Sequence, residues 1–169
     1  MRKKDVNMAD TIGIAITGAS GRMGQMLIKT IMHSDTMHLA GAIEQSRHDW
    51  VGRDVGDAMG TASMGVIVSD DAATAISDVD VIIDFTIPQA TVAFAEFAAA
   101  AGVAHIIGTT GFDAGHLSQI AKSAQKIPIV RAGNMSLGIN LLVKLTKQVA
   151  VTLDADFDIE IIEAHHNKK

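Results

Sequence analysis

Short apolar runs rich in β-branched residues alternate along most of the chain with longer alanine-rich stretches. The apolar runs are predicted to be buried strands, at Thr11–Thr17, Leu39–Ile43, Val66–Val68, Val79–Phe85, Val103–Ile107 and Ile127–Val130. The stretches between them favour helices, at Met23–Met32, Asp71–Ile76, Gln89–Ala101 and Asp113–Lys126. This alternation predicts an α/β fold, in which helices cover both faces of a parallel sheet. Between the second and third strands, the glycine-dotted stretch Gln45–Met64 predicts a long surface loop.

The pattern changes after Val130. Leu137–Leu153 predicts a long helix with one apolar side, and Asp156–Ala164 alternates apolar and polar residues, as a half-exposed strand does. Such a strand does not belong in a sheet that is buried on both faces. We therefore predict a flexible N-terminal tail over 1–10, a sheet domain over 11–135, and over 136–169 a hinge helix and the first strand of a second, α+β domain.

A glycine-rich turn, GASGRMG at Gly18–Gly24, follows the first predicted strand and opens a helix. Glycines there permit a tight turn, and the start of the helix favours a pyrophosphate. The spacing G-x-x-G-x-x-G is a weak signal by itself, because a purely structural turn can look the same. Glu44 ends the second predicted strand, at about the position where an acid meets the adenosine ribose. Together these features predict a Rossmann-type, doubly wound, dinucleotide-binding domain.

Three more predicted strands end in loops of small and hydroxyl-bearing residues. In each loop taken alone, the small and hydroxyl-bearing residues are explained by the need for a turn. Ligands of open parallel sheets, however, bind beyond the carboxyl ends of the strands, where these loops lie. With the glycine-rich turn, these loops predict a dinucleotide crevice along one edge of the sheet. The predicted cofactor-binding residues are Gly18, Ala19, Ser20, Gly21, Arg22, Met23, Gly24, Glu44, Gln45, Phe85, Thr86, Gly108, Thr109, Thr110, Ala132, Gly133, Asn134 and Met135.

Composition narrows the classes of function. The chain has 169 residues and a formal net charge of -5, so no global charge draws it to nucleic acid or to an anionic membrane. No apolar run has the length of a membrane span. Cysteine is absent, which excludes disulfides and thiolate chemistry. These features predict a cytoplasmic protein without nucleic-acid or membrane partners.

Five segments in this order resemble the dihydrodipicolinate reductase family: GASGRMG, VIIDFT, HIIGTTGF, AGNMSLGIN and EIIEAHH. The resemblance extends from Ile12 to Lys169. It implies a Rossmann domain followed by an α+β domain that binds a cyclic dicarboxylate and assembles a homotetramer. It also implies the reduction of 4-hydroxy-tetrahydrodipicolinate to tetrahydrodipicolinate in the diaminopimelate pathway of lysine biosynthesis. It also implies NADH or NADPH as the cofactor. Many family members have a basic residue directly after the ribose-binding acid, where it can meet the 2′-phosphate of NADPH, but this chain has Gln45 there. Arg22 of the glycine-rich turn could still contribute, so the preference between the two cofactors stays open.

The last residues, EAHHNKK, resemble the first part of the family's catalytic motif. The resemblance implies that His165 and Lys169 carry the proton chemistry and that His166 binds the substrate. The remainder of that motif does not follow in this sequence. The chain is therefore expected to correspond to the front part of the enzyme, truncated within the active site, and to show little or no turnover by itself.

Other interpretations of these residues stay open. A solvated polar tail would explain the two lysines and two histidines, and a non-catalytic dinucleotide-binding module, a sensor or regulator, would explain the glycine-rich turn. No metal site is expected, because adjacent histidines on an extended chain point apart and no third ligand stands at a usual spacing. The remaining histidines are expected to be surface or strand residues: His33, His38, His48, His105 and His116.

Overall fold

The computed structural model of the chain describes residues 11–153 and 156–162. They belong to two compact units, Met1–Gly133 and Asn134–Lys169. The division falls close to Ser136, where the sequence pattern places a domain boundary.

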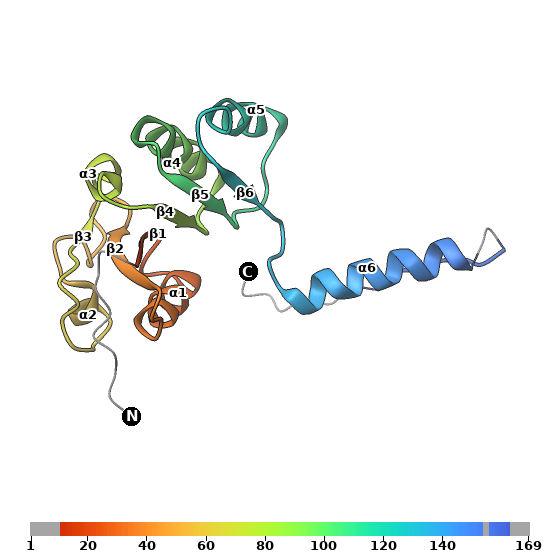
Figure 1. The fold of residues 1–169 in the computed structure, drawn as a ribbon, viewed down its shortest axis with the longest axis horizontal. Coiled ribbons are helices and arrows are strands. Elements are labelled where there is room, and N and C mark those ends of the chain that lie inside the picture. Colours follow the sequence, from red (N-terminus) through yellow and green to blue (C-terminus); the bar gives the residue numbers. More distant parts are fainter. Residues whose placement is uncertain (1–10, 154–155, 163–169) are drawn as a thin grey trace. The chain divides into compact units, whose positions relative to one another are not determined.

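A six-stranded parallel sheet forms the centre of the first unit, with the strand order β3-β2-β1-β4-β5-β6 (Figure 1). The strands are β1 (Ile12–Thr17), β2 (Met37–Ile43), β3 (Val68–Ser69), β4 (Val81–Asp84), β5 (Ala104–Ile107) and β6 (Ile129–Arg131). From β1 the chain proceeds outward to β3 and then crosses to β4, on the other side of β1. This reversal creates a crevice at the carboxyl ends of β1 and β4. The predicted Rossmann-type, doubly wound sheet is confirmed.

Helices cover both faces of this sheet. Those of the first unit are α1 (Arg22–Met32), α2 (Val55–Ala58), α3 (Ala72–Ile76), α4 (Pro88–Ala101) and α5 (Ala114–Ser123). Helices α1 and α2 lie on one face, and α3, α4 and α5 lie on the other (Figure 1). The ends of α4 follow from its sequence, because Pro88 suits the first helical position and Gly102 ends the helix with a φ of 76°.

The core consists of apolar side chains from alternate positions of the strands. In β1, Ile14 and Ile16 pack toward the face that Ile28 of α1 covers, whereas Ala15 packs with Ile82 and Ile76 on the opposite face. A third cluster joins α4 to α5 above β5. The two-sided burial of β1 explains why its sequence is apolar at successive positions.

A short helix interrupts the stretch that was predicted to be irregular. Helix α2 lies within Gln45–Met64, so that prediction is wrong at this point. Asp54 caps the helix: its carboxylate accepts hydrogen bonds from the backbone N–H groups of Gly56, Asp57, Met64 and Gly65. The bond from Met64 is the largest influence on the pKa of Asp54, and together the donors lower that pKa to about 2 although burial opposes the shift. A four-residue helix has too few apolar positions to reveal itself by periodicity.

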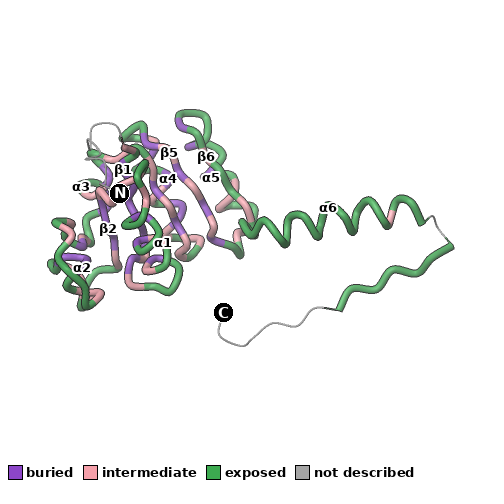
Figure 2. Tube along the Cα trace, turned by 60° about the horizontal axis from the view of Figure 1, so that its bottom comes forward, coloured by how far each residue is buried: buried purple, intermediate pink, exposed green. Residues whose placement is uncertain are grey.

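The second unit contains helix α6 (Leu137–Thr152), which begins where the side chain of Ser136 accepts a hydrogen bond from the backbone of Ile139. None of its residues is buried, and its leucines, isoleucine and valines are exposed around the helix (Figure 2). The strand predicted over Asp156–Ala164 is not formed within residues 156–162. A strand needs a hydrogen-bonded neighbour, and no described residue pairs with this segment.

Candidate dinucleotide-binding site

The glycine-rich turn brings the start of α1 against the end of β1. Gly18 has a φ of 64°, a left-handed conformation that glycine adopts without strain. A Cβ atom at Gly24 would lie 2.3 Å from the carbonyl oxygen of Gly18 and 2.8 Å from that of Ala19. The cap residue Gly21 supplies no side-chain acceptor to the first turn of α1. The loop is therefore a tight cradle beside a helix start, which is a suitable place for a pyrophosphate.

Glu44 connects this loop to the end of β2. Its Oε1 accepts hydrogen bonds from the backbone N–H of Ser20, at 2.9 Å, and from the Ser20 hydroxyl, at 2.6 Å. Its Oε2 accepts one from the backbone N–H of Gln45, at 3.0 Å. The backbone N–H of Glu44 itself donates to the carbonyl of Ser69 in β3. The carboxylate is thus held beside the glycine-rich loop.

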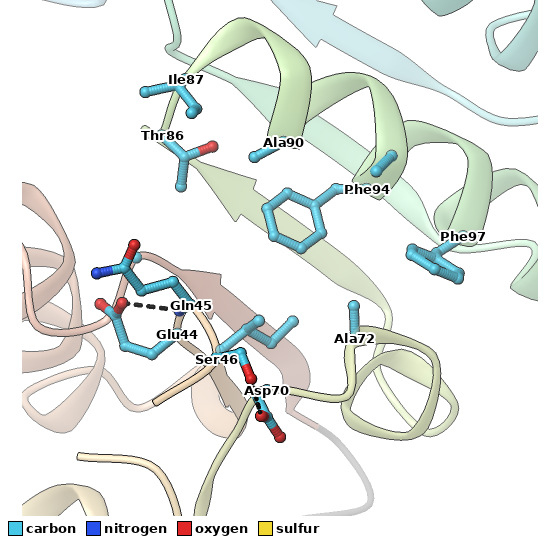
Figure 3. Close-up of a pocket in the computed structure, with 13 residues that line it drawn as sticks. Glu44, Gln45, Ser46, Asp70, Ala72, Thr86, Ile87, Ala90, Phe94 and Phe97 are labelled. Atoms are coloured by element: carbon cyan, nitrogen blue, oxygen red, sulfur yellow. Dashed lines mark hydrogen bonds between the residues drawn. The ribbon is translucent and has the colours of Figure 1, made fainter. Parts of the chain in front are cut away.

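Beside Glu44 lies a hollow of about 430 Å³. Side chains of α4 line one wall, and residues from the ends of β2 and β3 face them (Figure 3). The lining residues are Gly18, Ile43, Glu44, Gln45, Ser46, Asp70, Ala72, Thr86, Ile87, Ala90, Ala93, Phe94 and Phe97. The hollow therefore combines an apolar and aromatic wall with a carboxylate edge, as an adenosine group requires.

A buried carboxylate fixes the loops that follow β4 and β5. Asp84, fully buried, accepts hydrogen bonds through Oδ1 from the hydroxyls of Thr17, Thr86 and Thr109, at 3.0, 2.6 and 3.4 Å. The backbone N–H of Thr86 donates to the same oxygen and to the hydroxyl of Thr109. Thr91 of α4 donates to Thr109 at 2.9 Å. These bonds join three strand ends at the edge of the crevice.

His105 lies next to this cluster. It is in β5 and fully buried, with Nε2 at 3.4 Å from Oδ2 of Asp84. The two atoms do not meet hydrogen-bond geometry but lie within the distance of an ion pair. Burial by itself would raise the pKa of Asp84, but His105 and the threonine hydroxyls outweigh it and lower that pKa. The carboxylate form of Asp84 is therefore the stable one at neutral pH.

The structure brings part of the predicted cofactor set together. Gly18, Glu44, Gln45 and Thr86 line the hollow. The ring of Phe85 packs against Gly108, where a Cβ atom would lie 2.1 Å from the ring, so those two loops are in close contact.

The other predicted residues are not among those that line the hollow. Thr109 is buried in the polar cluster, and Thr110 is exposed. Ala132 and Gly133 follow β6 in the first unit, whereas Asn134 and Met135 belong to the second unit. The remaining predicted positions are within the glycine-rich loop and the start of α1: Ala19, Ser20, Gly21, Arg22, Met23 and Gly24. His165, His166 and Lys169 lie outside the described residues.

Sequence reasoning missed several residues of the site. Thr91 does not stand out in the sequence. Asp84 could have been found, because a carboxylate at the end of an apolar strand is a signal of a buried polar site. Asp70 and the aromatic side chains Phe94 and Phe97 come to the hollow only through the fold. Their spacing from the glycine-rich loop carries no motif.

Other kinds of site find no support in the described part of the chain. Residues 11–153 and 156–162 contain no group of three or more histidine, cysteine, aspartate or glutamate side chains that could hold a metal ion. No helix within these ranges is long and apolar enough to cross a membrane. A glycine cradle, a neighbouring carboxylate and an apolar hollow fit a dinucleotide, since they offer places for its pyrophosphate, a ribose and the adenine ring.

Comparison with known proteins agrees with this geometry. The family model described as "Dihydrodipicolinate reductase, N-terminus" matches residues 12–135. The 4-hydroxy-tetrahydrodipicolinate reductase of Ruegeria sp. (strain TM1040) is 60% identical over 162 residues, which are 96% of this chain and 60% of that protein. The enzyme of the same name from Rhizobium meliloti is 43% identical over 156 residues, 92% of this chain and 64% of that protein. The chain thus spans about three fifths of the length of these relatives.

Solved structures show the same fold. A dipicolinate-bound dihydrodipicolinate reductase from Paenisporosarcina sp. TG-14 aligns with a TM-score of 0.66 and 28% identity, covering 83% of this chain and 54% of that one. A biliverdin reductase from Synechocystis sp. PCC 6803 aligns with a TM-score of 0.59 and 17% identity, covering 84% of this chain and 42% of that one. The second likeness is one of fold.

Proposed function

This chain belongs to the dihydrodipicolinate reductase family, and we propose that its protein reduces 4-hydroxy-tetrahydrodipicolinate to tetrahydrodipicolinate with NADH or NADPH. This reaction belongs to the diaminopimelate pathway of lysine biosynthesis. We also propose that the protein works in the cytoplasm as a homotetramer. Residues 11–135 provide the dinucleotide-binding part.

The observation that carries the proposal is the contact between the glycine-rich loop and Glu44. Two donors of Ser20 hold the Glu44 carboxylate, which lines the hollow, beside the cradle that Gly18 and Gly24 form. A dinucleotide fits this arrangement with its pyrophosphate at the start of α1, its adenosine ribose at Glu44 and its adenine against the apolar wall. This orientation directs the rest of the cofactor along the carboxyl edge of the sheet.

The bound cofactor supplies the hydride, and the protein supplies position and a proton. Asp84 helps to position the cofactor, because its carboxylate holds the loops of Thr86 and Thr109 at the edge of the crevice. Loop atoms that are fixed before binding lose little entropy when the cofactor arrives.

The proton chemistry is proposed for residues outside the described part. His165 and Lys169 would hold and deliver the proton, and His166 would bind a carboxylate of the cyclic dicarboxylate substrate, as family membership implies. Cationic or donor side chains suit a doubly anionic ligand. The structure of the Paenisporosarcina relative contains dipicolinate, a cyclic dicarboxylate, which supports this class of substrate.

A chimera tests the function. The chain would be continued with the part of the Ruegeria sp. enzyme that lies beyond the matched region, and the oxidation of NADH and NADPH would be followed by absorbance with and without 4-hydroxy-tetrahydrodipicolinate. We expect oxidation that depends on the substrate. In the same chimera, His165→Gln or Lys169→Ala should lower kcat by at least about 100-fold and change cofactor affinity little.

Two outcomes would contradict the proposal. A folded chimera that binds the cofactor but does not oxidise it with substrate would instead indicate a dinucleotide-binding module. An active chimera that is indifferent to both substitutions would contradict the assignment of His165 and Lys169. Circular dichroism on each variant separates these results from misfolding.

A further inference from the structure

A second carboxylate, that of Asp70, lines the same hollow as Glu44, and both face the side chains of α4 (Figure 3). Asp70 follows β3 directly, and Ser46 comes shortly after the end of β2. Strands β2 and β3 are parallel neighbours, with Ile43 paired to Ser69, so their carboxyl ends bring the two residues together. The Ser46 hydroxyl donates a hydrogen bond to Oδ2 of Asp70 at 2.9 Å (Figure 3).

The charged side chains that line the hollow are both acidic. They are Glu44 and Asp70, and no lysine or arginine is among its described lining residues. Arg47 is next in sequence to Ser46 but does not line the hollow. The hydroxyl of Ser46, a donor that a ligand anion could use, is already bonded to Asp70.

NADPH differs from NADH by a phosphate on the 2′-oxygen of the adenosine ribose. If Glu44 binds that ribose, the phosphate of NADPH would enter the region between Glu44 and Asp70. A phosphate carries a charge of about -1.5 to -2 at pH 7, and like charges in close contact repel each other strongly. No described lining residue offers a positive charge to offset this repulsion.

We propose that Asp70, held in place by Ser46, makes this site selective for NADH by repelling the 2′-phosphate of NADPH. This inference rests on the proposed function, because it requires a nicotinamide dinucleotide in the hollow. Asp70 is a specificity-determining residue in this view: its carboxylate discriminates between two cofactors that share every other group.

The test compares the affinities of this chain for NADH and NADPH by calorimetry, in the wild type and in Asp70→Asn. We expect the wild type to bind NADH at least about tenfold more tightly than NADPH at low salt. Asp70→Asn should reduce that ratio at least about threefold, through tighter NADPH binding, and leave NADH affinity nearly unchanged. Because salt screens repulsion between exposed charges, the wild-type ratio should fall as salt rises from about 0.02 M to 0.3 M.

A matched control separates this local effect from net charge. Asp78→Asn removes the same charge from an exposed position that does not line the hollow, and it should leave the ratio unchanged. Ser46→Ala, which frees the Asp70 side chain, should lower the ratio less than Asp70→Asn does.

The outcomes distinguish the two proposals. Equal affinity for both cofactors in the wild type, or an Asp70→Asn variant with an unchanged ratio, would overturn the selectivity inference and leave the proposed function intact. Binding of neither cofactor by the folded chain would overturn the proposed dinucleotide site and this inference with it.

Discussion

Replacing Glu44 with alanine tests whether the acid at the end of β2 binds the adenosine ribose. In the structure this carboxylate accepts three hydrogen bonds, two from Ser20 and one from the backbone of Gln45. Oε1 is therefore already engaged by the glycine-rich loop. A ribose hydroxyl must share that oxygen with Ser20 or use Oε2.

This competition limits the expected effect. A hydrogen bond to a charged group contributes about 1.5–3 kcal/mol. A ribose offers two hydroxyls, but the engaged Oε1 reduces their net gain to that of roughly one such bond. Glu44→Ala should therefore weaken NADH binding by about 1–3 kcal/mol, which corresponds to an increase in Kd of about 5- to 150-fold.

Isothermal titration calorimetry with NADH measures this change directly. Glu96→Ala is the matched control, because Glu96 is an exposed carboxylate of α4 that does not line the hollow. Circular dichroism and thermal melting establish that both variants fold. Unchanged affinity in a folded Glu44→Ala variant would remove Glu44 from the site. An equal loss in Glu96→Ala would refute a local contact and indicate an effect of net charge.

Two further predictions concern the support of the site. Gly24→Ala places a methyl group 2.3 Å from the carbonyl oxygen of Gly18, so the loop must shift. The Kd for NADH should therefore rise at least about fivefold, and the Tm of the chain should fall. An unchanged Kd would contradict the role of this loop as a pyrophosphate cradle. The pKa of Asp84 in the folded protein lies below its usual range, so its contribution to the free energy of unfolding is present above about pH 4 and is lost as pH falls through the folded pKa. Urea unfolding at a series of pH values should show this loss in the wild type and a flatter profile in Asp84→Asn; parallel profiles would contradict the role of Asp84.

The predicted strands of the first unit all correspond to observed strands, with ends displaced by one to a few residues. Val79–Phe85 was predicted where β4 covers Val81–Asp84, and Val66–Val68 where β3 covers Val68–Ser69. Strand ends depend on where the ladder with a neighbour stops, which a single sequence does not contain. Helix α2 was missed because four residues contain too few apolar positions to show a helical period, and the bonds from Met64 and Gly65 that fix its cap residue Asp54 arise only once the loop is folded.

His105 illustrates the same limit within the core. The sequence offered only the expectation of a surface or strand residue, and the structure places it fully buried beside Asp84. The two residues are 21 positions apart, but β4 and β5 are paired, so their side chains meet on one face of the sheet. The strand predicted at Asp156–Ala164 is not formed within residues 156–162 for the opposite reason, since its alternation suits a strand but no described residue pairs with this segment.

By itself the sequence determined the fold class and the location of the glycine-rich loop, because apolar runs, helix-favouring stretches and glycines act over a few residues. It also indicated Glu44, through the separation that one βαβ unit imposes between loop and acid. Only the tertiary structure decided which other side chains share the hollow. Asp70, Phe94 and Phe97 reach it because the strand order brings β3 and α4 to the edge where β2 ends. That order is set by the packing of the helices on the two faces of the sheet, a long-range property that no local pattern carries.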